Sequence, residues 1–167
     1  MSFQVGDIVV HPAHGIGQIV KLEEKRFFGK EISLYYEVAI QHSTVWVPFA
    51  SPDAQRLRTL TLKSELPRYR SVLKSPPAVL NKDYRQRHLE LAERLKPGSF
   101  LVMCEIVRDL TARGWHKSLN ELDAVLLQRM RRRLCDEWAT ALSISVAAAT
   151  EEVTALLLEG RKVAVAS

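Results

Sequence analysis

Cysteine is scarce in this 167-residue sequence, which contains only Cys104 and Cys135. Two cysteines cannot form a disulfide framework for a chain of this length, and neither belongs to a C-x-x-C pair. No apolar run approaches the roughly 20 residues that a transmembrane helix needs. The N-terminal residues also lack the basic segment and the long apolar stretch of a secretion signal. We therefore expect a cytoplasmic protein without a membrane segment.

Sequence motifs of common enzyme classes are missing as well. There is no G-x-S-x-G, P-loop, H-E-x-x-H or Rossmann glycine pattern. Gly15 and Gly17 lie between two expected strands and not before a helix, so they predict no phosphate-binding loop. His11 and His14 have a spacing that can bind metal on a helix, but Pro12 interrupts them and no cysteine is near in sequence. We expect no enzymatic activity, no small-molecule substrate, no cofactor and no metal.

Positive charge is unevenly distributed along the chain. The net charge is +5, yet residues 1–60 contain six basic and six acidic side chains, so the whole excess lies in residues 61–167. A neutral first part and a basic second part suggest that only the second part meets a polyanion such as nucleic acid. Charge alone does not decide this, because many basic proteins touch no nucleic acid.

Residues 3–50 have the pattern of short β-strands. Segments rich in β-branched and aromatic residues alternate with Gly, Pro or polar turns. Four or five strands in fewer than 60 residues cannot form a wide sandwich, so we expect a small, strongly bent antiparallel sheet that closes toward an SH3-like or Tudor-like barrel. The expected strands cover residues 8–10, 17–21, 34–40 and 44–48.

From about residue 62 the hydrophobic pattern becomes helical. Pro67 fits the first turn of a short helix over 64–73, and the expected N-caps of the next three helices are Asn81, Ser99 and Ser118. These helices are expected to end near residues 95, 113 and 142, and a last helix to end at Gly160, before a frayed tail over 161–167. The sequence thus predicts an α+β chain of two domains: a β-barrel over 1–60 and an all-α bundle of four or five helices over 61–160.

Several runs of the sequence are similar to one protein family. The opening VGDIVVHPAHGIGQIV closely resembles the domain shared by the CarD/CdnL family and the polymerase-interacting module of the transcription-repair coupling factor, and FFGKEISLYYEV and TVWVP follow in the family order. YRQRHLELAERLKPG, CEIVRDL and ALSISVAAATEEV extend the resemblance over nearly the whole chain. The resemblance implies a bacterial transcription regulator. Its Tudor-like domain would add an edge strand to the RNA polymerase β subunit, while its helical domain stabilises the open promoter complex at the upstream edge of the transcription bubble.

The predicted polymerase-binding residues lie on the strand over 44–48 and beside it. The resemblance matches Lys25 to a basic contact residue, and Trp46 to a position where relatives carry a basic or aromatic residue that faces the polymerase. Period-two alternation places Trp46 outward if Val45 and Val47 fill the core; in the alternative, Trp46 is itself a core residue. The predicted set is Lys25, Tyr36, Val45, Trp46 and Val47.

Tyr84 is the central residue of the predicted DNA contact. The resemblance places it where relatives often have a tryptophan that enters the minor groove as a wedge. The tyrosine therefore implies a weaker or differently placed wedge, and the alternative is a surface residue that covers apolar neighbours. Lys82, Arg85 and Arg87 flank it and suit phosphate contacts with weak sequence preference.

Residues 129–133 form the densest basic cluster. Arg129, Arg132 and Arg133 share one face of the expected helix, and Arg129 aligns with a basic residue implicated in DNA contact in relatives. The alternative is structural, with ion pairs to Asp136 and Glu137 one turn away. The complete predicted DNA-binding set is Lys82, Tyr84, Arg85, Arg87, Arg129 and Arg132.

A second function stays open at this point, that of a Tudor/KOW-like RNA-binding protein without polymerase contact. It requires basic residues on the barrel, whose charge balance is zero. A methyl-lysine reader would need an aromatic cage, for which Tyr35, Tyr36 and Trp46 are weak candidates.

Overall fold

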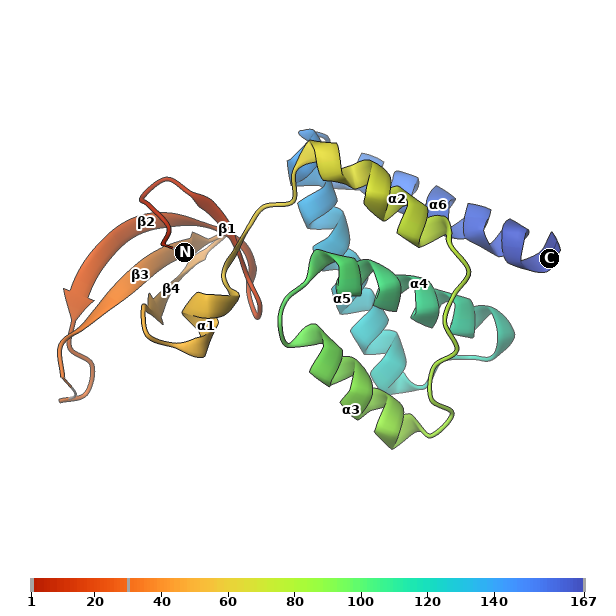
Figure 1. Ribbon diagram of the computed structural model, residues 1–167, viewed down its shortest axis with the longest axis horizontal. Helices are drawn as coiled ribbons and strands as arrows, with labels where there is room; N and C mark the ends of the chain where they lie inside the picture. Colours follow the sequence, from red (N-terminus) through yellow and green to blue (C-terminus); the bar gives the residue numbers. More distant parts are fainter. Residues whose placement is uncertain (1, 30, 167) are drawn as a thin grey trace. The chain divides into compact units, whose positions relative to one another are not determined.

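A computed structural model describes residues 2–29 and 31–166 of the chain. The chain divides into two compact units, Met1–Leu60 (unit 1) and Thr61–Ser167 (unit 2). Unit 1 carries the strands and unit 2 carries most of the helices, so the chain is an α+β protein of two parts (Figure 1). Each unit has a hydrophobic core of its own.

Unit 1 is an antiparallel sheet with strand order β4-β3-β2-β1-β5. Alternate side chains of its strands point into one core, which includes Val9, Ile19 and Val38. Gly17 allows β2 to lie close to β3, because a Cβ atom there would be 2.7 Å from Val38 Cγ1. The elements are β1 (Ile8–His11), β2 (Gly15–Lys25), β3 (Ser33–Ile40), β4 (Ser43–Pro48), α1 (Pro52–Arg56) and β5 (Arg58–Thr59).

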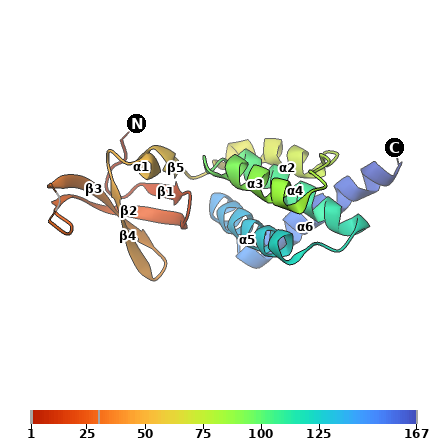
Figure 2. The ribbon, with the colours of Figure 1, turned by 90° about the horizontal axis from the view of Figure 1, so that it is seen from below.

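Unit 2 is an all-α bundle in which α2 packs against α6 and α4, and α5 packs against both α4 and α6 (Figures 1 and 2). Its core is built around Trp138, Leu134, Ile106 and Leu66, all fully buried. The elements are the 3-10 turn η1 (Lys63–Glu65), α2 (Leu66–Lys74), α3 (Tyr84–Leu95), α4 (Phe100–His116), α5 (Glu121–Leu142) and α6 (Val146–Ala166).

The helix boundaries differ from the sequence-based expectation at three places. Asp83 and Asn120 are the N-caps of α3 and α5, in place of Asn81 and Ser118. Gly160 does not end the last helix, since α6 continues to Ala166. This glycine is needed for packing: a Cβ atom at Gly160 would lie 3.0 Å from the carbonyl oxygen of Lys74 at the end of α2. The expectation of a frayed tail from residue 161 is therefore wrong for the described residues.

In the described residues, no single helix is long and apolar enough to cross a membrane. The pair of α5 and α6 meets the criteria of length and composition only when taken together, and the two helices are bent by 113° at their break.

Candidate functional site

Trp46 faces outward from the sheet of unit 1. Its side chain is 39 % exposed, whereas Val47 is buried and Val45 packs against the core. The alternation predicted for this strand is therefore confirmed. In the described residues β4 is the first strand in the sheet order and pairs with β3 alone, so it is an edge strand whose outer backbone groups have no strand partner.

Four side chains gather on the outward face of this sheet, and we call them the aromatic–lysine cluster: Lys25, Phe27, Tyr35 and Trp46. The Nζ atom of Lys25 lies 4.2 Å from the ring centroid of Trp46 and 5.8 Å from that of Phe27. The Phe27 ring in turn contacts Tyr35 and Trp46, with centroid separations of 5.1 and 6.3 Å. A cation over aromatic rings beside a strand edge combines the features of a protein-binding hot spot.

The cluster is electrostatically balanced by one acid. Glu23 pairs with Lys21 at 2.8 Å and with Lys25 at 3.0 Å. Hydrogen bonds from these two ammonium groups lower the pKa of Glu23 from 4.5 to about 2. Lys25 is therefore held in place by an acid on its own strand and presented against Trp46.

Three of the predicted polymerase-binding residues, Tyr36, Val45 and Val47, belong to the core of unit 1 or pack against it, outside the cluster. Tyr36 is 3 % exposed, its hydroxyl accepts a hydrogen bond from the backbone N–H of Phe3, and its ring stacks on Phe49. Tyr36 and Val47 are cross-strand partners and both point into the core. Period-two alternation could have predicted the burial of Tyr36, because Tyr36 lies on the same face of its strand as Val38. Phe27, which completes the cluster, was missed because it lies beyond the expected strand.

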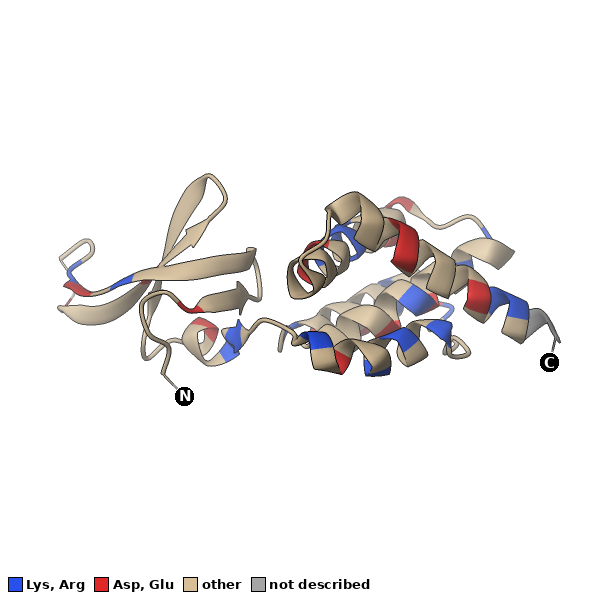
Figure 3. Ribbon diagram, turned by 90° about the horizontal axis from the view of Figure 1, so that it is seen from above, with Lys and Arg blue, Asp and Glu red and all other residues tan. Residues whose placement is uncertain are grey.

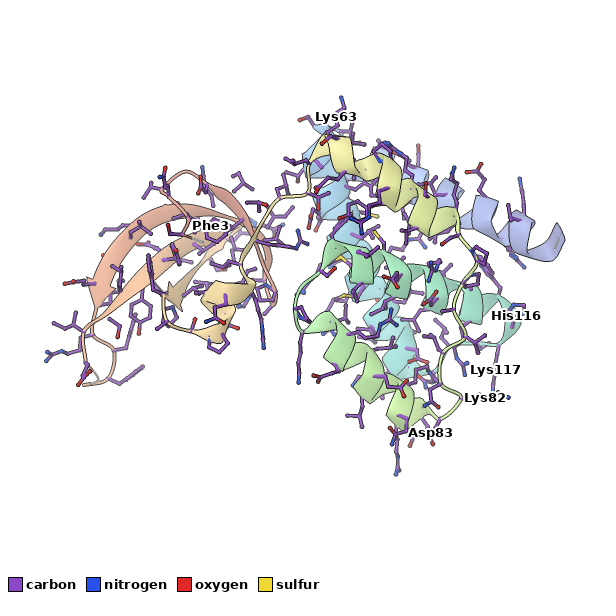
Figure 4. The ribbon with its side chains drawn as sticks, viewed as in Figure 1. Phe3, Lys63, Lys82, Asp83, His116 and Lys117 are labelled. Carbon is purple, nitrogen blue, oxygen red and sulfur yellow. The ribbon has the colours of Figure 1, made fainter. Side chains whose placement is uncertain are left out.

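Tyr84 is the first residue of α3 in unit 2 and is 47 % exposed. Its hydroxyl accepts a hydrogen bond of 3.0 Å from Arg85 Nε, and the Arg85 guanidinium lies 5.5 Å from the centroid of the Tyr84 ring. Asp83 caps the helix by accepting from the backbone N–H groups of Arg85 and Gln86. The exposed Lys82 precedes this cap (Figure 4). The structure thus brings Lys82, Tyr84 and Arg85 together at one helix end.

Arg87 does not join this exposed group. It is 3 % exposed and forms an ion pair with the buried Asp123 of α5, with 2.7 Å between Arg87 Nη2 and Asp123 Oδ2. Its side chain is closed off from a phosphate, so its place in the predicted DNA-binding set is corrected. A sequence signal existed: Arg87 is one helical turn before the buried Leu91, on the apolar face of α3.

Arg129 and Arg132 are exposed on α5, one of several helices of unit 2 that carry basic residues (Figure 3). Within the described residues, no ion pair joins either arginine to an acid. Glu137, which the structural alternative paired with an arginine, is buried and accepts hydrogen bonds from the backbone N–H and the hydroxyl of Thr61. Burial and the charge of Arg129 both lower the pKa of Arg133. Exposed cations on one helix face suit an anionic partner.

His11 and His14 are arranged as a turn. The Nδ1 atom of His11 accepts hydrogen bonds from the backbone N–H groups of Ala13 and His14, at 3.0 and 3.2 Å. Within the part of the chain that the structure describes, no group of three or more His, Cys, Asp or Glu side chains could hold a metal ion.

Comparison with known proteins gives two family matches, one in each half of the chain. Residues 3–61 match the model of the CarD-like/TRCF RID domain, and residues 69–154 match the model of the CarD C-terminal domain. The chain belongs to the CarD family. Among CarD-family relatives, the protein named "Putative transcription factor YdeB" from Bacillus subtilis (strain 168) is 28 % identical over 137 residues, which cover 81 % of this chain and 89 % of the relative. The aromatic–lysine cluster falls in the first matched domain, and Tyr84 and Arg129 fall in the second.

Proposed function

We propose that this CarD-family protein is a transcription regulator that binds the RNA polymerase β subunit through unit 1 and promoter DNA through unit 2. Unit 1 adds its β4 edge to a strand of the polymerase, with the aromatic–lysine cluster supplying the side-chain contacts. Unit 2 places Tyr84 at the upstream edge of the transcription bubble and contacts the flanking phosphates. By holding both partners, the protein slows closure of the bubble and stabilises the open complex in the cytoplasm.

The observation that carries the proposal is the separation of two exposed sites with different chemistry. One is an open strand edge beside Trp46 and Lys25, on a unit with no excess charge. Strand addition uses backbone hydrogen bonds for affinity and such side chains for specificity. The other is an aromatic side chain flanked by cations, on the unit that carries all the excess positive charge. An aromatic wedge between phosphate-binding cations suits a melted duplex better than a protein surface.

The first arm of the test measures binding of the full chain to RNA polymerase. The double variant Lys25→Glu, Trp46→Ala is expected to lower the affinity at least tenfold, about 1.4 kcal/mol or more. It removes a hot-spot aromatic and reverses the charge of the neighbouring Lys25. Arg56→Glu, a charge reversal on α1 of the same unit, is the matched control and should bind like the wild type. Equal binding by the double variant would remove the cluster from the interface.

The second arm measures the lifetime of the polymerase–promoter open complex. Tyr84→Ala is expected to shorten the lifetime severalfold, since the wedge that opposes bubble closure is lost. Leu89→Ala changes an exposed side chain on the same helix and should leave the lifetime unchanged. If both variants behave alike, Tyr84 has no part in the mechanism. Tight RNA binding by unit 1 residues, without polymerase affinity, would favour the RNA-binding alternative.

A further inference from the structure

Helix α3, which presents Tyr84, is held to the rest of unit 2 by few side chains. Of its 12 residues, only Arg87 and Leu91 are buried. Its closest packing in the described residues is against α4. Leu80 in the preceding loop and Leu95 at the far end of α3 also pack against the core. No apolar side chain in the first turn of α3 is buried, so hydrophobic packing alone leaves the position of Tyr84 weakly determined.

The guanidinium of Arg87 supplies the missing restraint. Its Nε atom donates to Asp123 Oδ2 at 2.9 Å, and its Nη2 atom lies 2.7 Å from the same oxygen. Its Nη1 atom donates to the backbone carbonyl oxygens of Asn81 and Lys82, at 2.7 and 3.2 Å. One side chain therefore ties α5 to the loop that enters α3.

The loop is ordered further by the residues around it. Asn81 Oδ1 accepts a hydrogen bond from the backbone N–H of Asp83, which in turn caps α3. Asp123 is fixed at the start of α5, where its own backbone N–H donates to the capping Asn120. The chain of bonds runs without interruption from the first turn of α5 to the residues on either side of Lys82.

We propose that Arg87 and Asp123 form a clamp that positions Lys82, Tyr84 and Arg85 for DNA. Arg87 is a positioning residue: it acts on the nucleic acid through the loop and makes no phosphate contact. Asp123, a buried acid, has the same role from the other side. This inference rests on the proposed contact between unit 2 and DNA. It predicts that the buried carboxylate of Asp123 strengthens DNA binding, although it is negatively charged.

Arginine is required here because of its geometry. The planar guanidinium donates in several fixed directions at once, and in this site it serves a carboxylate and two carbonyl oxygens. A lysine at this position keeps the charge but has a single nitrogen that cannot reach all three acceptors. Loss of either partner would leave the other as an unpaired buried charge, which is strongly destabilising locally.

The sign of the Asp123→Asn effect is the sharpest test. Removal of a negative charge strengthens binding to a polyanion when only electrostatics acts. The clamp predicts the opposite: the full-length Asp123→Asn protein should bind a forked duplex at least fivefold more weakly, measured by fluorescence anisotropy. Binding as tight as that of the wild type, or tighter, by a folded Asp123→Asn protein would overturn the proposal.

Arg87→Lys provides a second variant that does not depend on the first. It should weaken binding at least fivefold, with no change in the slope of log Kobs against log salt concentration, because no phosphate contact is lost. Arg85→Gln, by contrast, should reduce the magnitude of that slope by about 0.9 on duplex DNA. A reduced slope for Arg87→Lys would show a direct phosphate contact and contradict the clamp.

Hydrogen exchange tests the clamp without any DNA. Backbone amides over residues 81–88 should exchange faster in Asp123→Asn and Arg87→Lys than in the wild type. Arg70→Lys is the matched control, because it makes the same substitution in the ion pair between α2 and α6. Unchanged exchange at 81–88 in Arg87→Lys would reject the clamp, even if Asp123→Asn failed to fold. If the wild-type protein did not bind forked DNA, the proposed function would be refuted. The hydrogen-exchange result would still decide whether the clamp exists.

Discussion

The two units of this protein satisfy their buried backbone groups in different ways. In unit 1 the sheet pairs most of them strand to strand, and its core is closed by apolar side chains. In unit 2 the segments that connect the helices have no sheet partner. In the described residues, the buried Arg, Asp and Glu side chains all lie in unit 2: Arg87, Asp109, Asp123 and Glu137.

Three of these buried charges bind the backbone of a connecting segment. Arg87 donates to the carbonyl oxygens before α3, Asp109 accepts from the N–H of Ala78 at 3.0 Å, and Glu137 accepts from the N–H of Thr61 at 3.2 Å. Long connections between helices leave polar groups that only side chains can satisfy. Unit 2 therefore contains two classes of charge: buried ones that fix its connecting segments, and exposed ones such as Arg129 and Arg132.

The largest expected loss of stability comes from a substitution that breaks one of the buried contacts. Asp109→Ala leaves Ala78 N–H without its acceptor, and Arg108 loses its ion-pair partner at 2.8 Å while it keeps its hydrogen bond to Ser75. We expect unit 2 to lose about 3 kcal/mol of unfolding free energy, in the range for a buried ion pair that has lost one member. Hydrogen exchange followed by mass spectrometry can measure the loss separately in each unit.

The same substitution in unit 1 sharpens the comparison. Asp53 of α1 lies 4.0 Å from Arg56 on the surface, so Asp53→Ala should change stability by less than about 0.5 kcal/mol. Asp109→Ala should leave the exchange of unit 1 unchanged. Equal losses for the two alanine variants would show that burial does not separate the two classes of charge.

The sequence predicted the division of the chain and the outward face of β4 because both depend on local periodicity. Strand alternation was enough to place Trp46, and the change to a helical period marked the start of unit 2. The five-residue α1 and the two-residue β5 were missed, since neither is long enough to show a period. Predicted helix starts also differed from the structure where two possible N-cap residues lie close together, as Ser118 and Asn120 do before α5.

The burial of individual charges was harder to predict. Arg85 and Arg87 look alike in the sequence, and the partner of Arg87 is 36 residues away on another helix. Glu137, which one alternative paired with an arginine one turn away, also binds Thr61, 76 residues earlier. Such pairs depend on tertiary packing, which no local pattern contains. For Arg87 alone, its position on the same helix face as Leu91 indicated that the side chain is buried.

A smaller effect is expected from the exposed charges of unit 2. Arg129→Gln and Arg132→Gln should each reduce the salt dependence of DNA binding by about 0.9 in the log–log slope if each arginine contacts one phosphate. Because neither side chain has an ion pair in the described residues, the unfolding free energy should change by less than about 0.5 kcal/mol. Titrations at several salt concentrations measure the slope, and a slope equal to that of the wild type would exclude a phosphate contact.

The smallest expected effect concerns Glu23, an acid of unit 1 with a large pKa shift. Its pKa is lowered to about 2 by hydrogen bonds from Lys21 and Lys25. A lowered carboxyl pKa means that the folded state gains stability while the group is ionised. This gain is present above about pH 4.5 and is lost as the pH falls toward 2. Since the group is only partly buried, the gain is small, and Glu23→Gln should differ from the wild type at pH 6 but match it near pH 2. The carboxyl carbon shift of Glu23, followed by NMR between pH 7 and 2, should show its midpoint well below 4.5. A midpoint near 4.5 would mean that Glu23 does not hold Lys25, and that the aromatic–lysine cluster relies on the contact between the ammonium group and the Trp46 ring alone.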